Sequence, residues 1–273
     1  MNANHHFEIG KDHIVCQDYA LSGVGVDGTT AYVIISDGCS ASPQVDVGAR
    51  ILALSAKETL ASCGGSSYYE LFGLNIIQKA KGIFNVLPYL HPQALDATLL
   101  IAWVKNDILT AYMYGDGVFF YKGKAESRSL HISFLNDKPD FNGAPAYLSY
   151  NLDAKRINGY NSMGGIKMIE EVVDRLDGTD LSITHKILQP FDSVVVKMPV
   201  VGGDVFGVCS DGVGSFRKAD NEIIPYTDIL KQVTDYKSTA GVFVERCVKF
   251  FKRNCVKELT THSDDLSVAA IVV

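Results

Sequence analysis

Long hydrophobic runs are absent from this sequence. Its apolar stretches, such as the one over 98–104, are far shorter than the roughly 20 residues that cross a bilayer. The first ten residues, Met1 to Gly10, are polar, include two histidines and lack the apolar centre of a secretory signal. We therefore expect no membrane as a partner, no secretion and a cytoplasmic location.

Closely spaced cysteine pairs and an excess of positive charge are also lacking. The six cysteines lie far apart and form no C-x-x-C motif, so we expect reduced thiols rather than a zinc or redox site. The 25 Lys and Arg residues are outnumbered by 31 Asp and Glu residues, which gives a net charge of -6. This balance argues against nucleic acid as a partner and favours cations. We expect a monomer.

Segments with the pattern of strands make up much of the chain, and helical patterns lie between them. A composition of 47% hydrophobic and 21% charged residues is that of a compact folded protein. The expected strands are 30–36, 98–104, 108–114, 118–121, 130–135, 193–198, 205–210 and 266–273. The expected helices cover 43–61, with Ser42 as the capping residue, 67–87, 227–236 and the segment that follows Thr239.

Two short turns predict how these strands pair. Lys105-Asn106-Asp107 separates two apolar runs and Asp116-Gly117 separates two more, so an antiparallel meander is the simplest arrangement. The stretch over 136–178 has a mixed pattern and is expected to be a long excursion with a partly helical end. No second domain boundary is evident, so residues 1–273 are expected to form a single domain.

One local pattern recurs at strand ends, where an apolar run finishes in Asp-Gly. It occurs at Asp37, Asp116 and Asp211, and the order is reversed at Asp264-Asp265, directly before the last strand. In antiparallel neighbours the end of one strand lies beside the start of the next. Asp37, Asp211 and Asp264 are therefore expected to meet at one sheet edge.

Several carboxylates in one place repel each other unless a cation lies between them. Oxygen ligands suit Mg²⁺ or Mn²⁺, whereas zinc favours the Cys and His clusters that this sequence lacks. Asp18 could orient a water from outside the ligand set. A single Asp-Gly is usually only a turn, and this simpler interpretation applies most readily to Asp116-Gly117. The joint occurrence of the acids favours a metal site.

These residues resemble the metal-dependent PPM/PP2C-type Ser/Thr protein phosphatases, particularly bacterial members. The resemblance spans nearly the whole chain. It implies an α+β fold, a four-layer αββα sandwich with two central antiparallel sheets flanked by helices, and a two-metal centre at one end of the sheets. Its markers are Cys16-Gln17-Asp18, Asp37-Gly38, Gly48-Ala49, Thr98, Gly115-Asp116, Cys209-Ser210-Asp211-Gly212 and Asp264-Asp265-Leu266-Ser267.

The resemblance also implies roles for particular residues. Asp37 would bridge two metal ions, with the carbonyl of Gly38 as a further ligand, and Asp211 and Asp264 would bind the first ion. Asp18 would hold the water that reacts, so Asp18 and Asp37 are the expected catalytic residues.

Other positions depart from the family pattern. Asp116 matches the position of a third, weaker metal, but Ser215 stands where a further acid is expected, so a third ion is doubtful. His13 replaces an arginine that holds the substrate phosphate, and it is our candidate for substrate binding. Gln17 replaces a glutamate, and its amide brings no charge to the second metal. Cys39 stands where some members have a histidine, so no general acid is assigned.

The expected function is hydrolysis of phosphoserine and phosphothreonine in proteins by a water that two Mg²⁺ or Mn²⁺ ions activate, without a phosphoenzyme. A phosphorylated protein is then the partner, in a signalling role. The alternative is a pseudophosphatase that acts as a binding or regulatory module, which His13, Gln17 and Ser215 motivate. A metal-dependent phosphodiesterase is a third possibility, and the acidic net charge disfavours it.

Overall fold

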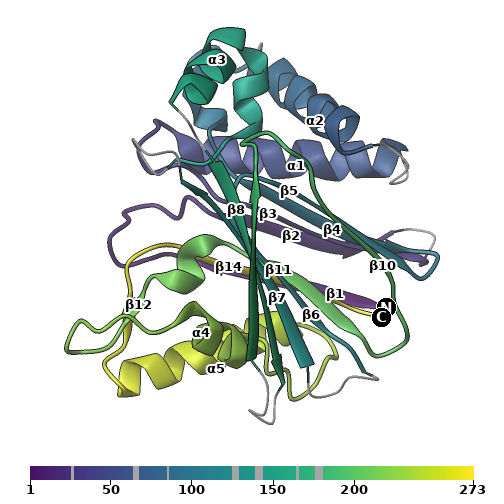
Figure 1. Cartoon of the computed structure of the whole chain (residues 1–273), viewed down its shortest axis with the longest axis vertical. Helices are drawn as coiled ribbons and strands as arrows, with labels where there is room; N and C mark the ends of the chain where they lie inside the picture. Colours follow the sequence, from purple (N-terminus) through teal and green to yellow (C-terminus); the bar gives the residue numbers. More distant parts are fainter. Residues whose placement is uncertain are drawn as a thin grey trace.

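Two antiparallel sheets face each other at the centre of the molecule (Figure 1). The computed structural model describes residues 1–25, 28–63, 68–84, 86–124, 129–138, 144–163, 166–175 and 181–273. One sheet has seven strands in the order β1-β14-β11-β6-β7-β8-β9, and the other has five in the order β10-β5-β4-β3-β2. The short strands β12 and β13 form a separate pair.

The strands have the following bounds: β1 (Asn2–Glu8), β2 (Tyr19–Val24), β3 (Thr30–Ser36), β4 (Leu99–Lys105), β5 (Ile108–Tyr114), β6 (Gly117–Lys122), β7 (Ser129–Lys138), β8 (Ile166–Arg175), β9 (Leu181–Leu188), β10 (Val194–Pro199), β11 (Val205–Cys209), β12 (Phe216–Arg217), β13 (Thr261–His262) and β14 (Leu266–Val272). The expected strands are all found among them, with ends that differ by a few residues at most.

Helices cover the outer face of each sheet. The α-helices are α1 (Val45–Cys63), α2 (Tyr69–Phe84), α3 (Ala154–Ser162), α4 (Tyr226–Val233) and α5 (Phe243–Lys257), and the short 3₁₀ helices are η1 (Pro92–Leu95), η2 (Leu148–Leu152) and η3 (Asp211–Gly214). In Figure 1, α1 and α2 lie on the five-stranded sheet with α3 beyond them, and α4 and α5 lie under the seven-stranded sheet. The expected αββα sandwich is confirmed.

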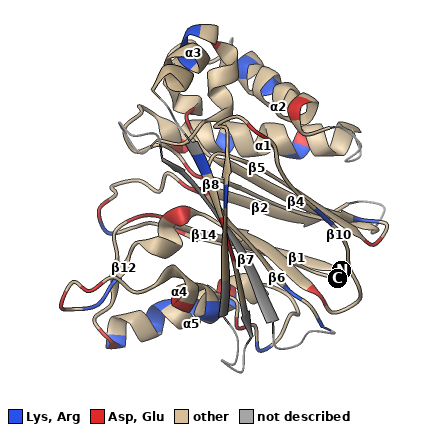
Figure 2. Ribbon diagram, viewed as in Figure 1, with Lys and Arg blue, Asp and Glu red and all other residues tan. Residues whose placement is uncertain are grey.

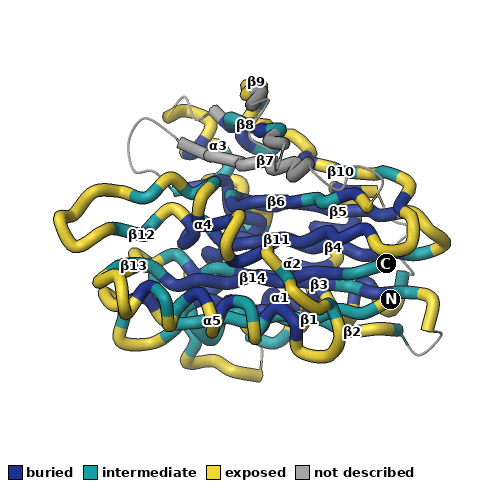
Figure 3. Tube along the Cα trace, turned by 90° about the horizontal axis from the view of Figure 1, so that it is seen from below, coloured by how far each residue is buried: buried dark blue, intermediate teal, exposed yellow. Residues whose placement is uncertain are grey.

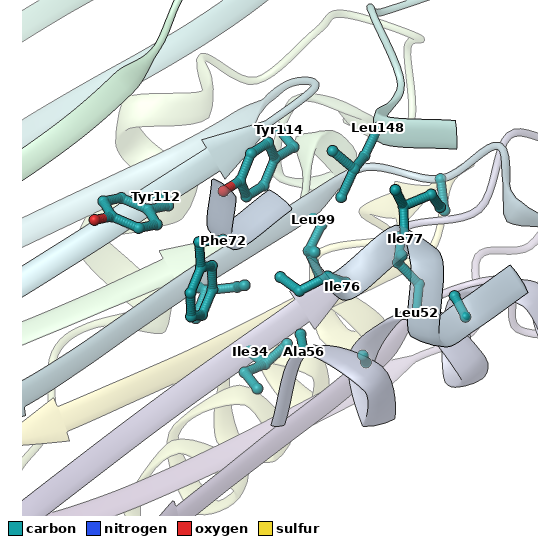
Figure 4. Close-up of a cluster of buried hydrophobic side chains, with 14 of the residues drawn as sticks. Ile34, Leu52, Ala56, Phe72, Ile76, Ile77, Leu99, Tyr112, Tyr114 and Leu148 are labelled. Carbon is teal, nitrogen blue, oxygen red and sulfur yellow. The ribbon is translucent and has the colours of Figure 1, made fainter. Parts of the chain in front are cut away.

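Three apolar layers hold this sandwich together, and Figure 3 shows that central strands such as β3, β4, β11 and β14 are mostly buried. The layer between α1, α2 and the five-stranded sheet includes Leu52, Phe72 and Ile76 (Figure 4). A second layer lies between the two sheets, and a third joins the seven-stranded sheet to α4 and α5.

Alternation along a strand explains how one sequence serves two layers. In β3, Ile34 belongs to the layer under the helices, whereas Val33 and Ile35 belong to the layer between the sheets. Successive side chains of a strand point to opposite faces. A strand covered on both faces therefore reads as a continuous apolar run, which is what made β3 visible in the sequence.

The chain passes from one sheet to the other between β5 and β6. The expected meander is correct for β4 and β5, which pair across the turn at Asn106 and Asp107. It is wrong for Asp116-Gly117, because β5 and β6 lie in different sheets. Gly115 and Gly117 have φ angles of +98° and +134°, which favour glycine and turn the chain out of the first sheet.

Two further expectations are corrected. Ser42 does not cap a helix, because α1 begins only at Val45 and the Ser42 hydroxyl donates to the carboxylate of Asp96 instead. The excursion over 136–178 does not end in a helix: α3 lies in its middle, and its described end is the strand β8, which pairs with both β7 and β9. Residues 139–143, 164–165 and 176–178 of this segment lie outside the described ranges.

Within the ranges given above, no helix combines the length and the apolar character that crossing a membrane requires.

We predict opposite stability effects for two glycine substitutions in helices. A Cβ at Gly48 of α1 would lie 1.6 Å from the carbonyl oxygen of Ala94, whereas a Cβ at Gly82 of α2 would meet no atom within 4 Å. Gly48→Ala should lower the free energy of unfolding by about 2 kcal/mol or more through overpacking. Gly82→Ala should raise it by up to about 1 kcal/mol, because alanine is the better helix former.

Urea denaturation measures both changes. A Gly48→Ala protein as stable as the wild type would contradict the tight contact between α1 and η1.

Candidate active site

Four aspartates that come from both sheets line one cavity. Asp37 follows β3 of the five-stranded sheet, whereas Asp211 follows β11 and Asp264 precedes β14 in the seven-stranded sheet. Asp116 lies on the crossing between the sheets, and all four line a cavity of about 630 Å³. The expected convergence of Asp37, Asp211 and Asp264 is found, but it occurs across the two facing sheets rather than at one sheet edge.

Asp37 is held by the segment that leads into β4. Its backbone carbonyl accepts a hydrogen bond from the Thr98 amide at 2.8 Å, and its own amide donates to Thr98 Oγ1 at 3.3 Å. Gly38 continues this contact as an antiparallel bridge with Ala97. Burial, together with the charges of Asp18 and Asp211, raises the pKa of Asp37 well above its usual range.

Asp18 lies buried between the two sheet ends. Only 1% of the residue is exposed, and Ser210 Oγ donates to its Oδ2 at 2.9 Å. Burial raises the pKa of Asp18, and the neighbouring side chains of Ser267, Asp37 and Ser210 offset part of that rise. Its Oδ1 is buried and has no hydrogen bond of ordinary geometry among the described residues. Asp18 therefore keeps an acceptor atom beside Asp37.

Asp265 ties the segment before β2 to the start of β14. Its carboxylate accepts hydrogen bonds from the backbone amides of Gly10 at 2.7 Å and Gln17 at 2.5 Å. His13 Nδ1 lies 3.0 Å from Asp265 Oδ2. Because the residue is 1% exposed, these contacts satisfy a buried charge and fix the loop that carries His13 and Gln17.

The residues that depart from the family pattern have structural contacts of their own. His13 does not line the cavity; its Nε2 lies 3.6 Å from Asp264 Oδ1 and 3.4 Å from Ser40 Oγ. Burial lowers the pKa of His13, but the stronger combined effect of Asp265 and Asp264 raises it, so the net shift of this pKa is upward. Gln17 accepts a hydrogen bond from Ser40 Oγ at 2.8 Å. Substrate binding by His13 stays a prediction.

Ser215, in the place of the acid expected after Asp211, supports the backbone. Its hydroxyl donates to the Gly212 carbonyl at 2.8 Å and accepts from the Asp264 amide at 3.3 Å. This hydroxyl therefore joins the loop after β11 to the segment before β14.

All six cysteines are free, in accord with the reduced thiols expected. Cys39 lines the cavity together with Tyr147. Cys209 is buried in the layer under α4 and α5, and burial raises the pKa of its thiol.

Part of the cavity lining comes from residues that were not predicted from the sequence. Asp96, Tyr147, Tyr150 and Arg156 line it together with the aspartates. Arg156 Nη1 lies 3.0 Å from Asp96 Oδ1 and Nη2 lies 2.7 Å from Asp96 Oδ2, a two-point ion pair. Asp96 lies two residues before Thr98, and this closeness to a motif could have pointed to it in the sequence. Arg156 lies in the segment over 136–178, where no motif pointed to it.

The donor set fits a hard divalent cation by its chemistry. Carboxylates that raise one another's pKa are stabilised as anions when a cation lies between them. In the conformation described, no group of three or more His, Cys, Asp or Glu side chains among the described residues is arranged to hold an ion. A cation in the cavity would offset the repulsion that raises the pKa values of Asp37 and Asp264.

The αββα sandwich is a fold shared with several solved bacterial phosphatases. A bacterial serine phosphatase superposes with a TM-score of 0.56 at 11% identity, covering 100% of this chain and 98% of the other. The catalytic domain of the serine threonine protein phosphatase PstP, solved with two manganese ions, has a TM-score of 0.54 at 13% identity, with 100% and 98% covered. The serine/threonine phosphatase of S. agalactiae has a TM-score of 0.54 at 12% identity, with 100% and 99% covered.

A family profile is more specific than this likeness of fold. The profile described as protein phosphatase 2C matches residues 9–251. The chain belongs to the protein phosphatase 2C family, which supports a Ser/Thr phosphatase-type function at the level of the family. No curated protein matches the sequence.

We predict that Asp265→Ala loosens the segment over 9–18. The substitution removes the acceptor for two buried backbone amides, those of Gly10 and Gln17, and hydrogen bonds to charged groups contribute about 1.5–3 kcal/mol each. Hydrogen exchange measured by mass spectrometry should become faster in peptides from this segment, and the free energy of unfolding should fall by about 3–6 kcal/mol.

Asp220→Ala is the matched control, because Asp220 is an exposed aspartate outside the cavity. Unaltered exchange over 9–18 in Asp265→Ala would show that this carboxylate does not hold the loop.

Proposed function

We propose that this protein is a metal-dependent phosphomonoester hydrolase that removes phosphate from phosphoserine or phosphothreonine in proteins. The observation that carries the proposal is the placement of Asp37, Asp116, Asp211 and Asp264 around one cavity in a chain of the protein phosphatase 2C family. In this proposal residues 1–273 act as one phosphatase domain. The monomeric state, the cytoplasmic location and the lack of nucleic-acid and membrane partners stay predictions.

The acids of the cavity would hold two Mg²⁺ or Mn²⁺ ions. We assign Asp37 to both ions, the Gly38 carbonyl to one of them, and Asp211 and Asp264 to the other. Asp116 would serve a third ion only weakly, because the hydroxyl of Ser215 is engaged with the backbone where a further acid is needed. When bound, the ions supply a lowered water pKa and neutralise charge on the phosphoryl group.

The chain's own groups would orient the attacking water. Asp18 is held by Ser210 on one oxygen and keeps Oδ1 as an acceptor, so it can accept a proton from a water near Asp37. Thr98 fixes the backbone on both sides of the Asp37 peptide. Attack of water on phosphorus would break the bond from phosphorus to the Ser or Thr oxygen and release inorganic phosphate and the free hydroxyl.

A pseudophosphatase that acts as a binding module is the second candidate. Two features favour it. The ring of His13 is in contact with Asp265, and the amide of Gln17 brings no charge to the second ion. Both features would weaken turnover without altering the sandwich.

Hydrolysis of para-nitrophenyl phosphate and of a phosphothreonine peptide separates these candidates. We predict turnover with Mn²⁺ that a chelator abolishes and that excess metal restores. Turnover of bis-para-nitrophenyl phosphate should be much slower, because the proposal requires a monoester. Failure to hydrolyse either monoester with excess Mn²⁺ across pH 6–9 would favour the binding module.

Asp37→Ala and Asp211→Ala should each abolish this turnover and weaken Mn²⁺ binding while leaving the sandwich folded. Each carboxylate is a proposed ligand, and its removal leaves fewer oxygen donors for a hard cation. Isothermal titration calorimetry with Mn²⁺ measures the affinity, and circular dichroism checks the fold. Asp220→Ala is the control that should bind Mn²⁺ like the wild type. Titrations that neither substitution changes would refute the metal assignment.

A further inference from the structure

We propose that Arg156 of α3 binds the phosphate of the substrate, and that Asp96 is a positioning residue that holds the guanidinium at the cavity. This inference rests on the proposed function and deepens it, because it names the residue that recognises the phosphate. The juxtaposition that carries it is a two-point ion pair between the two residues on the wall of the cavity that the four aspartates line.

The charge of the cavity calls for such a residue. Among the described residues that line it, Arg156 is the one Lys, Arg or His, and it stands with five aspartates. A phosphate monoester carries up to two negative charges, which this wall would repel without a cation. The basic residues of α3 are blue in Figure 2 and lie at the end of the molecule where α1 and α2 pack.

His13 is poorly placed to supply that charge. It does not line the cavity, and its two ring nitrogens lie 3.0 Å from Asp265 and 3.6 Å from Asp264. A charge on this ring is therefore balanced by two acids already. Among the described residues Arg156 pairs with one acid, Asp96, and 26% of the Arg156 side chain is exposed against 4% for Asp96.

The guanidinium is fixed before a substrate arrives. Asp96 holds both Nη atoms, and the ring of Tyr150 stacks 4.1 Å from the Arg156 Cζ atom. Burial alone would lower the pKa of Arg156, but the hydrogen bonds and charge of Asp96 raise it above its usual value. Little side-chain entropy is therefore lost when an anion binds.

Asp96 also links Arg156 to the proposed metal ligands. Its carboxylate accepts from Ser149 Oγ at 2.7 Å, and its backbone carbonyl accepts from the Cys39 amide at 2.8 Å. Cys39 follows Asp37-Gly38 directly. The position of the guanidinium relative to Asp37 is therefore set by contacts that run through Asp96.

Donors remain on Arg156 for a phosphoryl oxygen. The pair with Asp96 engages one N–H of Nη1 and one of Nη2, and a guanidinium has five N–H donors in total. Arginine matches phosphate through two parallel hydrogen bonds, which lysine cannot form.

Kinetics of the Mn²⁺-loaded protein test this role. Arg156→Ala should raise the KM for para-nitrophenyl phosphate and for a phosphothreonine peptide by about 10- to 100-fold, which is what the loss of charge-assisted hydrogen bonds predicts. Inorganic phosphate, as a competitive inhibitor, should weaken by the same factor. Arg156→Lys should recover only part of the loss. Lys155→Ala removes an exposed cation from the preceding position of α3 and should leave all values unchanged.

A second variant separates recognition from folding. Arg156→Ala leaves the buried carboxylate of Asp96 unpaired and could lower the melting temperature for that reason alone. The double variant Asp96→Asn with Arg156→Gln removes both charges, so the melting temperature should return toward the wild type. The KM and the inhibition constant of phosphate should remain raised.

Three outcomes would overturn the inference. They are an Arg156→Ala protein with unchanged KM and phosphate inhibition, an equal effect of Lys155→Ala, and a raised KM for the peptide alone, which would mean contact with residues beside the phosphate. If the wild type hydrolyses neither monoester, the proposed function fails. Calorimetric titration of inorganic phosphate into Mn²⁺-loaded wild type and Arg156→Ala still tests the inference, since equal affinities would overturn it.

Discussion

Repulsion between carboxylates that share a cavity is the constraint on which the rest of this structure depends. Burial and the charge of Asp211 raise the pKa values of Asp37 and Asp264, and Asp18 is buried beside them. Such an arrangement persists only where the surrounding backbone leaves the side chains no other position. Three apolar layers supply that rigidity, because they fix both sheets and therefore the strand ends that carry the acids.

Polar contacts at the strand ends complete this support. Ser210 satisfies one oxygen of Asp18, Thr98 holds the peptide of Asp37, and Asp265 secures the loop before β2. None of these residues is a proposed metal ligand. Each lies in one of the motifs on which the resemblance to the family rests, so these motifs include residues that support the acids as well as the acids themselves.

Strands buried on both faces were predictable from the sequence, whereas the edge strands β1, β2 and β9 were missed and only β10 at an edge was found. β3 and β5 were found with their ends correct, because covering on both faces leaves a continuous apolar run. β1 was missed because its sequence, NANHHFE, is polar and pairs only with β14. The acids were predictable from recurring Asp-Gly, whereas the pair of Asp96 with Arg156 joins residues 60 positions apart that no motif connects. The choice of sheet for β6 depended on the φ angles of Gly115 and Gly117.

The chain passes from one sheet to the other at Asp116, so the shape of the cavity depends on how the two sheets are placed relative to each other. Because its acids are drawn from both sheets, any sliding of one sheet over the other changes the spacing of the carboxylates. A ligand that gathers them would conversely clamp the sheets together, so resistance to unfolding should report how fully the cavity is occupied.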